Sequence, residues 1–171
     1  RGGAAAPDPD DQADKYEFLS QAVVDRLHHY EVSNWATTAK ECRYNQTTWA
    51  QGEYAGFGLG AHSYRRGTRG RNVRRLEAYL DTVESGVRPT AGTERLSKWE
   101  REKERLFLGV RRRGGVHMGT VGRVFVSSVG GQRLIAAGVV RIDDDRLMVV
   151  DPLLTDAVAR EILATEKPAS D

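Results

Sequence analysis

The sequence predicts a mixed fold in which the end of an α/β unit is followed by a small, mainly α-helical unit that resembles a winged helix. Two patterns lead to this prediction. Between residues 10 and 32, a helical pattern is followed by a short strand, which is typical of the last part of an α/β unit. From residue 97 onward, helix, helix, helix and β-ribbon follow one another, which is the order of a winged helix. We therefore predict two units, residues 1–88 and 89–171.

The composition is that of a folded protein without a strong overall charge. The chain has 171 residues, of which 39% are hydrophobic and 18 are glycine, and its net charge is +2. Wholesale disorder is excluded, and the net charge is too small to attract nucleic acid or acidic lipid by itself. Because no apolar stretch approaches the roughly 18 residues of a membrane span, we predict no membrane span and a cytoplasmic location. The first residue is Arg1 rather than methionine, so we expect a C-terminal fragment of a longer polypeptide.

The first unit is predicted to begin with a helix and a strand. Asp10 or Asp11 can cap a helix that extends to about Leu27. Its apolar face, at helical spacing, consists of Tyr16, Leu19, Val23, Val24 and Leu27. A strand is expected at residues 28–32, and residues 35–71 show no lasting period because glycines interrupt them. We expect an irregular loop there, after which Asn72 caps another helix.

The second unit is predicted to follow a linker at residues 87–96. Ser97 and Glu100 have the spacing of a capping box, which starts a helix that ends near Arg113. The elements expected after it are, in order, a helical turn near His117, a helix over residues 129–137, strands over 139–142 and 147–150 that form a ribbon, and a helix over 152–164.

Several unlike motifs, taken together, resemble a known family. They are residues 30–36 (YEVSNWA), 41–49 (ECRYNQTTW), 58–63 (GLGAHS), 76–79 (LEAY), 86–89 (GVRP) and 104–109 (ERLFLG). In this order and at these spacings they are similar to the C-terminal part of radical S-adenosylmethionine (SAM) proteins of the oxygen-independent coproporphyrinogen oxidase type, specifically the HemW-type heme chaperones. The resemblance covers residues 8 to 116 and weakens in the last third.

The resemblance implies the end of a partial TIM-like radical-SAM barrel followed by a small winged-helix-like C-terminal domain. It also implies a 4Fe-4S cluster, on a Cys-x3-Cys-x2-Cys motif, and S-adenosyl-L-methionine in the full-length parent. Cys42 is the single cysteine, so the cluster ligands are absent from this chain. The expected parent binds and transfers heme to an acceptor protein, or is a coproporphyrinogen-dehydrogenase-like oxidoreductase, and we expect the fragment alone to be catalytically inert.

The presumed heme motif of the family, His-Asn-x-x-Tyr-Trp, projects onto Tyr44, Asn45, Thr48 and Trp49, so two positions match and two depart. A tyrosine phenolate can ligate heme iron, as it does in catalase, and Tyr44 can equally be a packed aromatic residue. Trp49 can stack on a porphyrin or pack the loop against its surroundings. The heme site is therefore a hypothesis with two open alternatives.

A second predicted contact region is the glycine loop, with Gly58, Gly60, Ala61 and His62. Glycine permits positive φ and close approach of a ligand to the backbone, and in the family resembled such a loop lines the SAM and substrate cleft. His62 can bind iron or a propionate, or can donate an ordinary hydrogen bond.

Arginines cluster directly after the glycine loop. Guanidinium groups pair well with carboxylates, so porphyrin propionates or the acidic surface of a partner are possible targets, with Arg65, Arg66 and Arg71 as the candidate contacts. The cluster has six arginines in eleven residues: Arg65, Arg66, Arg69, Arg71, Arg74 and Arg75. A solvated surface is the alternative reading of the same cluster. The function from a different class is a winged-helix interaction or DNA-binding module without catalysis. Its predicted recognition helix offers only Gln132 and Arg133 as long polar groups, so we expect no nucleic-acid partner.

Overall fold

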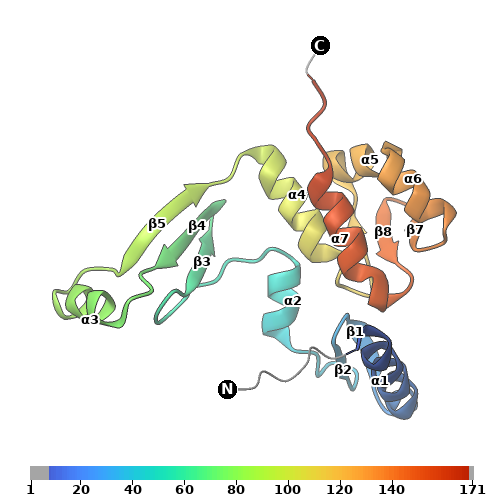
Figure 1. Ribbon diagram of the computed structural model, residues 1–171, viewed down its shortest axis with the longest axis horizontal. Coiled ribbons are helices and arrows are strands. Elements are labelled where there is room, and N and C mark those ends of the chain that lie inside the picture. Colours follow the sequence, from blue (N-terminus) through green and yellow to red (C-terminus); the bar gives the residue numbers. More distant parts are fainter. Residues whose placement is uncertain (1–7, 170–171) are drawn as a thin grey trace.

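Three parts of the chain follow one another in the computed structural model, which describes residues 8–169 (Figure 1). The N-terminal part holds α1 (Pro9–Val23), β1 (His28–Glu31), β2 (Asn34–Ala36) and α2 (Arg43–Trp49). The sheet lobe holds β3 (His62–Arg65), β4 (Thr68–Asn72), α3 (Leu76–Glu84) and β5 (Thr90–Arg95). The helical unit holds α4 (Lys98–Gly109), β6 (Val116–His117), α5 (Gly119–Ser127), α6 (Val129–Ala136), β7 (Val140–Asp143), β8 (Arg146–Val149), a 3-10 turn (Pro152–Leu154) and α7 (Thr155–Ala164).

The main hydrophobic core lies in the helical unit, where the helices pack around the small sheet β6-β8-β7. Leu106, Phe125 and Ile162 are fully buried there. The predicted capping box is confirmed, because Ser97 Oγ accepts from the Glu100 amide at 3.2 Å and Glu100 Oε2 accepts from the Ser97 amide at 2.7 Å. The predicted helix over residues 129–137 and the ribbon are confirmed as α6 and β7-β8.

Other boundaries in the helical unit differ from the sequence prediction. α4 ends at Gly109 rather than near Arg113, and the predicted helical turn near His117 is the strand β6. The prediction also missed α5, because two glycines in this helix lower its intrinsic propensity. One of them, Gly122, is required by packing, since a Cβ atom there would lie 2.6 Å from the Cβ of Met118.

The sheet lobe contradicts two predictions at once. Strands β3, β4 and β5 form one antiparallel sheet, so part of the stretch predicted as an irregular loop is a hairpin. The predicted linker contains β5, which pairs with β4. The division into two units stays a prediction, and strand pairing places residues 90–95 with the upstream part. Asn72 does not cap a helix but ends β4, and α3 begins at Leu76.

Strand β1 has neighbours on both edges. On one edge it pairs antiparallel with β2. Along the other edge runs the segment that follows α4: the Val32 amide donates to the Arg111 carbonyl at 2.9 Å, and the Arg113 amide donates to the Tyr30 carbonyl at 3.2 Å. These bonds join the N-terminal part to the helical unit.

Helix α1 lies against this hairpin mainly through one residue. The Tyr16 hydroxyl donates to the Val32 carbonyl at 2.7 Å, and the Tyr16 ring lies 5.5 Å from that of Trp35. The helix ends at Val23, earlier than predicted, and the predicted apolar face is only partly covered, since Leu19 is exposed.

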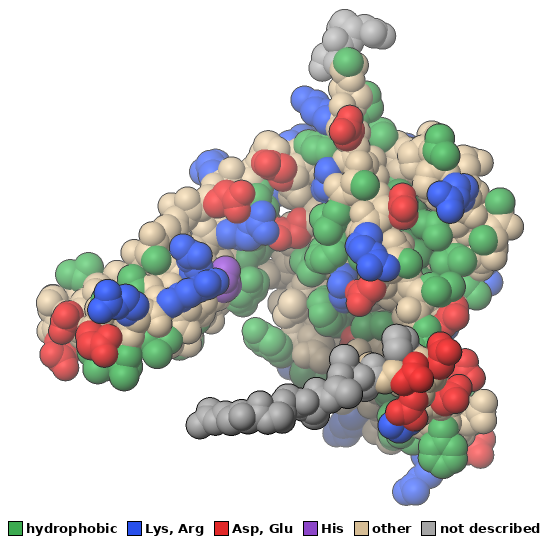
Figure 2. Space-filling view, in the orientation of Figure 1, with side chains coloured by type: hydrophobic (Ala, Val, Ile, Leu, Met, Phe, Trp, Pro, Cys, Tyr) green, Lys and Arg blue, Asp and Glu red, His purple; other side chains and the backbone are tan. Residues whose placement is uncertain are grey.

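Hydrophobic side chains also reach the surface of the sheet lobe. Leu76, Leu80 and Val83 of α3 are all exposed, and Figure 2 shows hydrophobic side chains gathered at this end of the molecule. Within the described residues, no helix combines the length and apolar character needed to cross a membrane.

Candidate functional site

A buried carboxyl group organises the region between the N-terminal part and the helical unit. Glu31, at the end of β1, has 0% exposure. It accepts hydrogen bonds from the Trp49 indole nitrogen at 3.1 Å, from the Ser33 amide at 3.4 Å and from the side-chain amide of Asn34. Since a buried acceptor is costly to leave unpaired, these donors hold the turn after β1 and the end of α2 in one arrangement.

The indole of Trp49 is covered on one face by a cation. The Arg111 guanidinium lies 5.3 Å from the centre of the Trp49 ring and 4.6 Å from that of Phe107, within cation–π range. Burial lowers the pKa of Arg111, while the charges of Asp156 and Glu31 act in the opposite direction. Trp49 therefore has its N–H group and one ring face engaged within the protein.

Helix α2 exposes Tyr44 to solvent. Tyr44 is 67% exposed, and in the described part of the chain its hydroxyl has no hydrogen-bond partner. Asn45 is half-buried on the same short helix. The helix is anchored at its far end by Trp49 and Gln51, whose side-chain nitrogen donates to the Arg101 carbonyl at 3.0 Å. The Tyr44 phenol is thus presented on a fixed support.

The glycine loop is held in shape by Asn72. The Asn72 side-chain amide donates to the carbonyl of Gly58 at 3.0 Å, and its backbone amide donates to the Ala61 carbonyl at 2.9 Å. Gly58 and Gly60 have φ values of 95° and 63°, which side chains with a Cβ rarely adopt. A Cβ at Gly58 would meet nothing within 4 Å, so this point of the loop is open to approach.

Beside the loop, His62 of β3 pairs with Arg71 of β4 at the open end of the β3-β4 hairpin. Together with Arg69, Glu94 and neighbouring backbone they line a notch of about 310 Å³. That volume is at the lower end of small-molecule sites. The charge of Arg69 is paired with Glu94 at 3.2 Å and with Glu104 at 3.0 Å, so His62 and Arg71 are the lining groups that can contact an anionic ligand.

The other predicted arginines lie at the far end of the hairpin. Arg65 pairs with Thr68 next to the turn, and its side chain lies 3.8 Å from Glu53. The Arg66 amide donates to the same carboxylate at 2.9 Å. The structure therefore brings Arg71 together with His62, but it places Arg65 and Arg66 elsewhere. Tyr44 is not among the residues that line the His62 notch.

Another arginine of the predicted cluster, Arg69, links the sheet lobe to α4. Arg69 lies 3.2 Å from Glu94 and 3.0 Å from Glu104. Tyr54 and Tyr64 pack around this contact, and burial raises the pKa of both hydroxyl groups. The sequence did not reveal this cluster, because the neighbouring strands lack the alternation of apolar and polar residues that marks a strand.

The residues present do not fit an iron-sulfur cluster. Cys42 is exposed, and the described residues contain no group of three or more histidine, cysteine or acidic side chains that could hold a metal ion. A 4Fe-4S cluster requires several thiolate ligands, so we derive no step through such a cluster from this chain.

Comparison with known proteins places this arrangement in a family. No family model matches the sequence. The chain is 34% identical, over 166 residues, to the heme chaperone HemW of Mycobacterium tuberculosis, an alignment that covers 95% of this chain and 42% of that protein. The chain belongs to the HemW-type family. It matches the C-terminal part of that family, as the motifs predicted.

Further relatives and a solved structure agree. The HemW of Synechocystis is 40% identical over 123 residues, which cover 68% of this chain and 29% of the relative. The mouse mitochondrial radical S-adenosyl methionine domain-containing protein 1 is 32% identical over 162 residues, which cover 84% of this chain and 36% of that protein. The radical SAM enzyme coproporphyrinogen III oxidase (HemN) from Escherichia coli shares the fold, with a TM-score of 0.70 and 14% identity, over 91% of this chain and 42% of that one. The chain thus spans less than half the length of these relatives.

Sequence reasoning did not find the residues that hold the candidate site in place. Glu31 and Arg111 are charged residues in buried or half-buried positions, which composition and periodicity do not predict. Asn72 was singled out as a helix cap but orders the glycine loop instead. The only signal that pointed to Glu31 was its place within the motif of residues 30–36.

Proposed function

We propose that this chain is the heme-contacting C-terminal part of a radical SAM heme chaperone, located in the cytoplasm. In the proposed parent, a preceding segment carries the 4Fe-4S cluster and most contacts with S-adenosyl-L-methionine. The parent passes heme to an acceptor protein, and this chain alone performs no catalysis. The family and the names of its relatives support this proposal.

The observation that carries the heme assignment is the presentation of Tyr44. Its phenol is exposed on α2 at the position onto which the family's heme motif projects, and that helix is anchored through Trp49 and Glu31. A phenolate is a competent axial ligand of heme iron. In this proposal Trp49 supports α2 from beneath rather than stacking on the porphyrin, because Arg111 covers one face of its ring.

In the same proposal, the notch beside the glycine loop receives an anionic group. His62 and Arg71 can donate to a propionate, and Gly58 leaves open space for a ligand to approach the backbone. Arg65 and Arg66 play no part in this notch, because they lie at the other end of the hairpin. A coproporphyrinogen-oxidase-like substrate would carry the same carboxylates.

Absorption spectra of heme added to the whole chain test the proposal. We compare the wild type with Tyr44→Phe, His62→Ala and, as a matched aromatic control away from the site, Tyr79→Phe. We expect the Soret band of heme to shift on binding to the wild type. The spectrum of the bound heme should differ from the wild type in Tyr44→Phe but not in Tyr79→Phe. Spectra that are the same in all four proteins would rule out both ligands.

The finer fold assignment is also a proposal. The order α4-β6-α5-α6-β7-β8, with three helices and a β-ribbon, supports a winged-helix-like domain, and the hairpin β1-β2 with α1 is proposed as the end of a partial barrel. A DNA-binding module is the alternative that this order favours. However, Gln132 of α6 already donates to the Val126 carbonyl at 2.5 Å, which leaves only Arg133 as a long polar group free to reach a groove. A DNA titration over a range of salt concentrations would separate the two.

A further inference from the structure

A groove of about 560 Å³ lies between α4 and the start of α5 and is rich in positive charge. Lys98, Arg101 and Arg105 of α4 line it, together with Arg123 of α5. Among its lining residues, Glu102 carries the single carboxylate. Most of the lining belongs to the helical unit, with Gln51 and Tyr64 added from upstream, and neither Tyr44 nor the glycine loop is part of it.

Most of this positive charge is not neutralised within the chain. Arg123 lies 3.1 Å from Asp145. Among the described residues, no ion pair joins Lys98, Arg101 or Arg105 to a carboxylate. An excess of cations in a recess focuses a positive field on whatever enters it.

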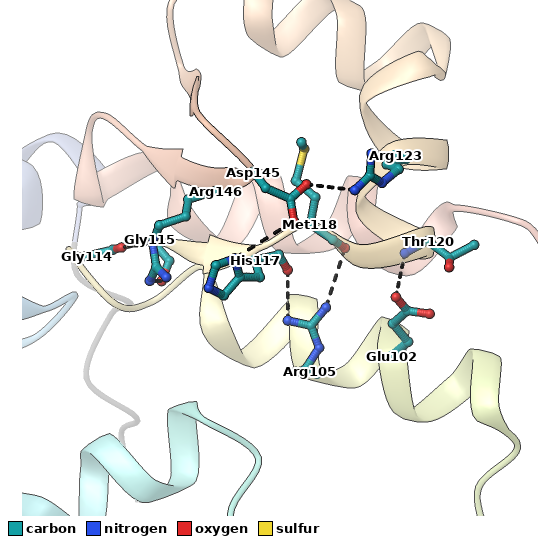
Figure 3. A network of polar contacts seen from close by, with 10 residues as sticks. All are labelled: Glu102, Arg105, Gly114, Gly115, His117, Met118, Thr120, Arg123, Asp145 and Arg146. Carbon is teal, nitrogen blue, oxygen red and sulfur yellow. Dashed lines mark hydrogen bonds and ion pairs between the residues drawn. The ribbon is translucent and has the colours of Figure 1, made fainter.

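The groove is built on fixed supports. Figure 3 shows Arg105 reaching from α4 toward the chain before α5, where it donates to the carbonyls of His117 at 2.8 Å and Met118 at 3.4 Å. In the same view Glu102 accepts from the Thr120 amide at 2.5 Å, so a carboxylate already caps the first turn of α5. Hydrogen bonds within the chain therefore hold Arg105, Glu102 and the start of α5 in place.

Arg101 is positioned by the sheet lobe. Its Cδ atom lies so close to Gly67 that a Cβ atom there would be 2.7 Å away. Gly67 has a φ of 76° in the β3-β4 turn, and its carbonyl accepts from the Leu96 amide at 2.9 Å. The side chain of Arg101 thus packs on the turn while it lines the groove.

The placement of two of these cations works against helix stability. Lys98 is the first residue of α4 and Arg101 follows one turn later, so both add positive charge to the positive end of the helix dipole. Glu100 of the capping box offsets only part of this charge. Residues that break a local rule without compensation within the fold are often kept for function.

We propose that this groove binds an acidic segment of a partner protein, with one or two of its carboxylate side chains seated among Lys98, Arg101 and Arg105. Guanidinium and ammonium groups donate charge-assisted hydrogen bonds to carboxylates, so these three side chains can hold the carboxylates of an acidic segment. The inference concerns a surface that the proposed heme contacts do not use.

A protein segment fits this groove better than a nucleic acid does. The sheet lobe contributes Tyr64 to the lining, whereas the four cationic lining residues all belong to α4 and α5. Positive charge is therefore confined to one side of a short recess. A duplex carries closely spaced phosphates and needs a longer basic track, whereas a short peptide needs only one or two paired carboxylates.

Fluorescence anisotropy of a fluorescein-labelled decaglutamate peptide, titrated with the whole chain at low salt and without heme, tests the inference. We expect Lys98→Glu/Arg101→Glu to bind the peptide at least about tenfold more weakly than the wild type. The control Arg141→Glu/Arg160→Glu changes the net charge equally at exposed positions outside the groove, and it is expected to stay within about twofold of the wild type. Because no heme is present, this readout is independent of the proposed heme function.

Two further measurements make the outcome decisive. Amide chemical shifts of residues 119–123 are expected to move during the peptide titration, and unchanged shifts there would overturn the assignment. An equal loss of affinity in both double variants would show a general charge effect and would also overturn it. So would a short DNA duplex that displaces the peptide and binds more tightly through the same residues. If the charge-reversed variant is unfolded by circular dichroism, Lys98→Gln/Arg101→Gln replaces it, with the same expected direction.

Discussion

Replacing Trp49 by phenylalanine tests whether the buried carboxyl of Glu31 organises the site. The substitution keeps an aromatic ring beneath the Arg111 guanidinium but removes the indole N–H that donates to Glu31 at 3.1 Å. Glu31 is fully buried, so water cannot replace the lost donor without opening the structure. Leaving part of a buried acceptor unsatisfied costs about 1–3 kcal/mol, and we expect this loss in the free energy of unfolding.

The assay is urea denaturation of the whole chain, and the control is Trp99→Phe. Trp99 is also half-buried, on α4, and its indole makes no hydrogen bond within the described residues. Both variants lose the same indole volume, so the difference between them isolates the bond to Glu31. We expect Trp49→Phe to be the less stable by about 1–3 kcal/mol with an unchanged denaturant slope. Equal stability of the two variants would refute the role assigned to Glu31.

Three other predictions concern stability. Burial holds the pKa of His29 below its usual 6.5, so the unfolded chain takes up the proton first as the pH falls. The free energy of unfolding should therefore decrease as the pH drops below 6.5. Urea midpoints over a pH series check this, and His29→Gln should make the midpoint depend less on pH. Gly119→Ala should cost about 1–3 kcal/mol, because φ there is 58° and the new Cβ would collide with Glu102, whereas Gly92→Ala, in open space, should be nearly neutral by thermal melting. Ser97→Ala should cost about 0.5–2 kcal/mol through loss of the cap, read as faster hydrogen exchange at the start of α4.

Local chemistry made the start of α4 and the β7-β8 ribbon predictable. The Ser97 and Glu100 pair is a signature that needs only neighbouring residues, and the β7-β8 ribbon has apolar strands around a polar turn. The sheet lobe has neither. Its strands carry arginine, glycine and threonine, and its turn uses Arg66 and Gly67 at positive φ rather than a common Asn-Gly pair. Backbone pairing with β5, which lies beyond α3 in the chain, completes the sheet, and no short window of sequence reveals it.

The predicted contact residues stay a prediction, and the structure shows only how accessible they are. Tyr44 is exposed and Gly58 is open to approach, as a contact with a ligand would require. Which residues hold these in place depends on contacts between distant segments. Glu31 meets Trp49 and lies beside Arg111 only because β1, α2 and α4 converge, so tertiary structure rather than local pattern decides that a charged residue is buried.

The pairing of residues 111–113 with the edge of β1 determines when the N-terminal hairpin can be completed. During synthesis β1 and β2 leave the ribosome before the sheet lobe and α4, so this edge of β1 stays unpaired until residues 111–113 have emerged. Contacts of such large sequence separation slow folding, and an open edge is a template for pairing with other chains. A nascent chain stalled before Arg113 would therefore be the species most prone to aggregate, and chaperone access would matter most in that interval.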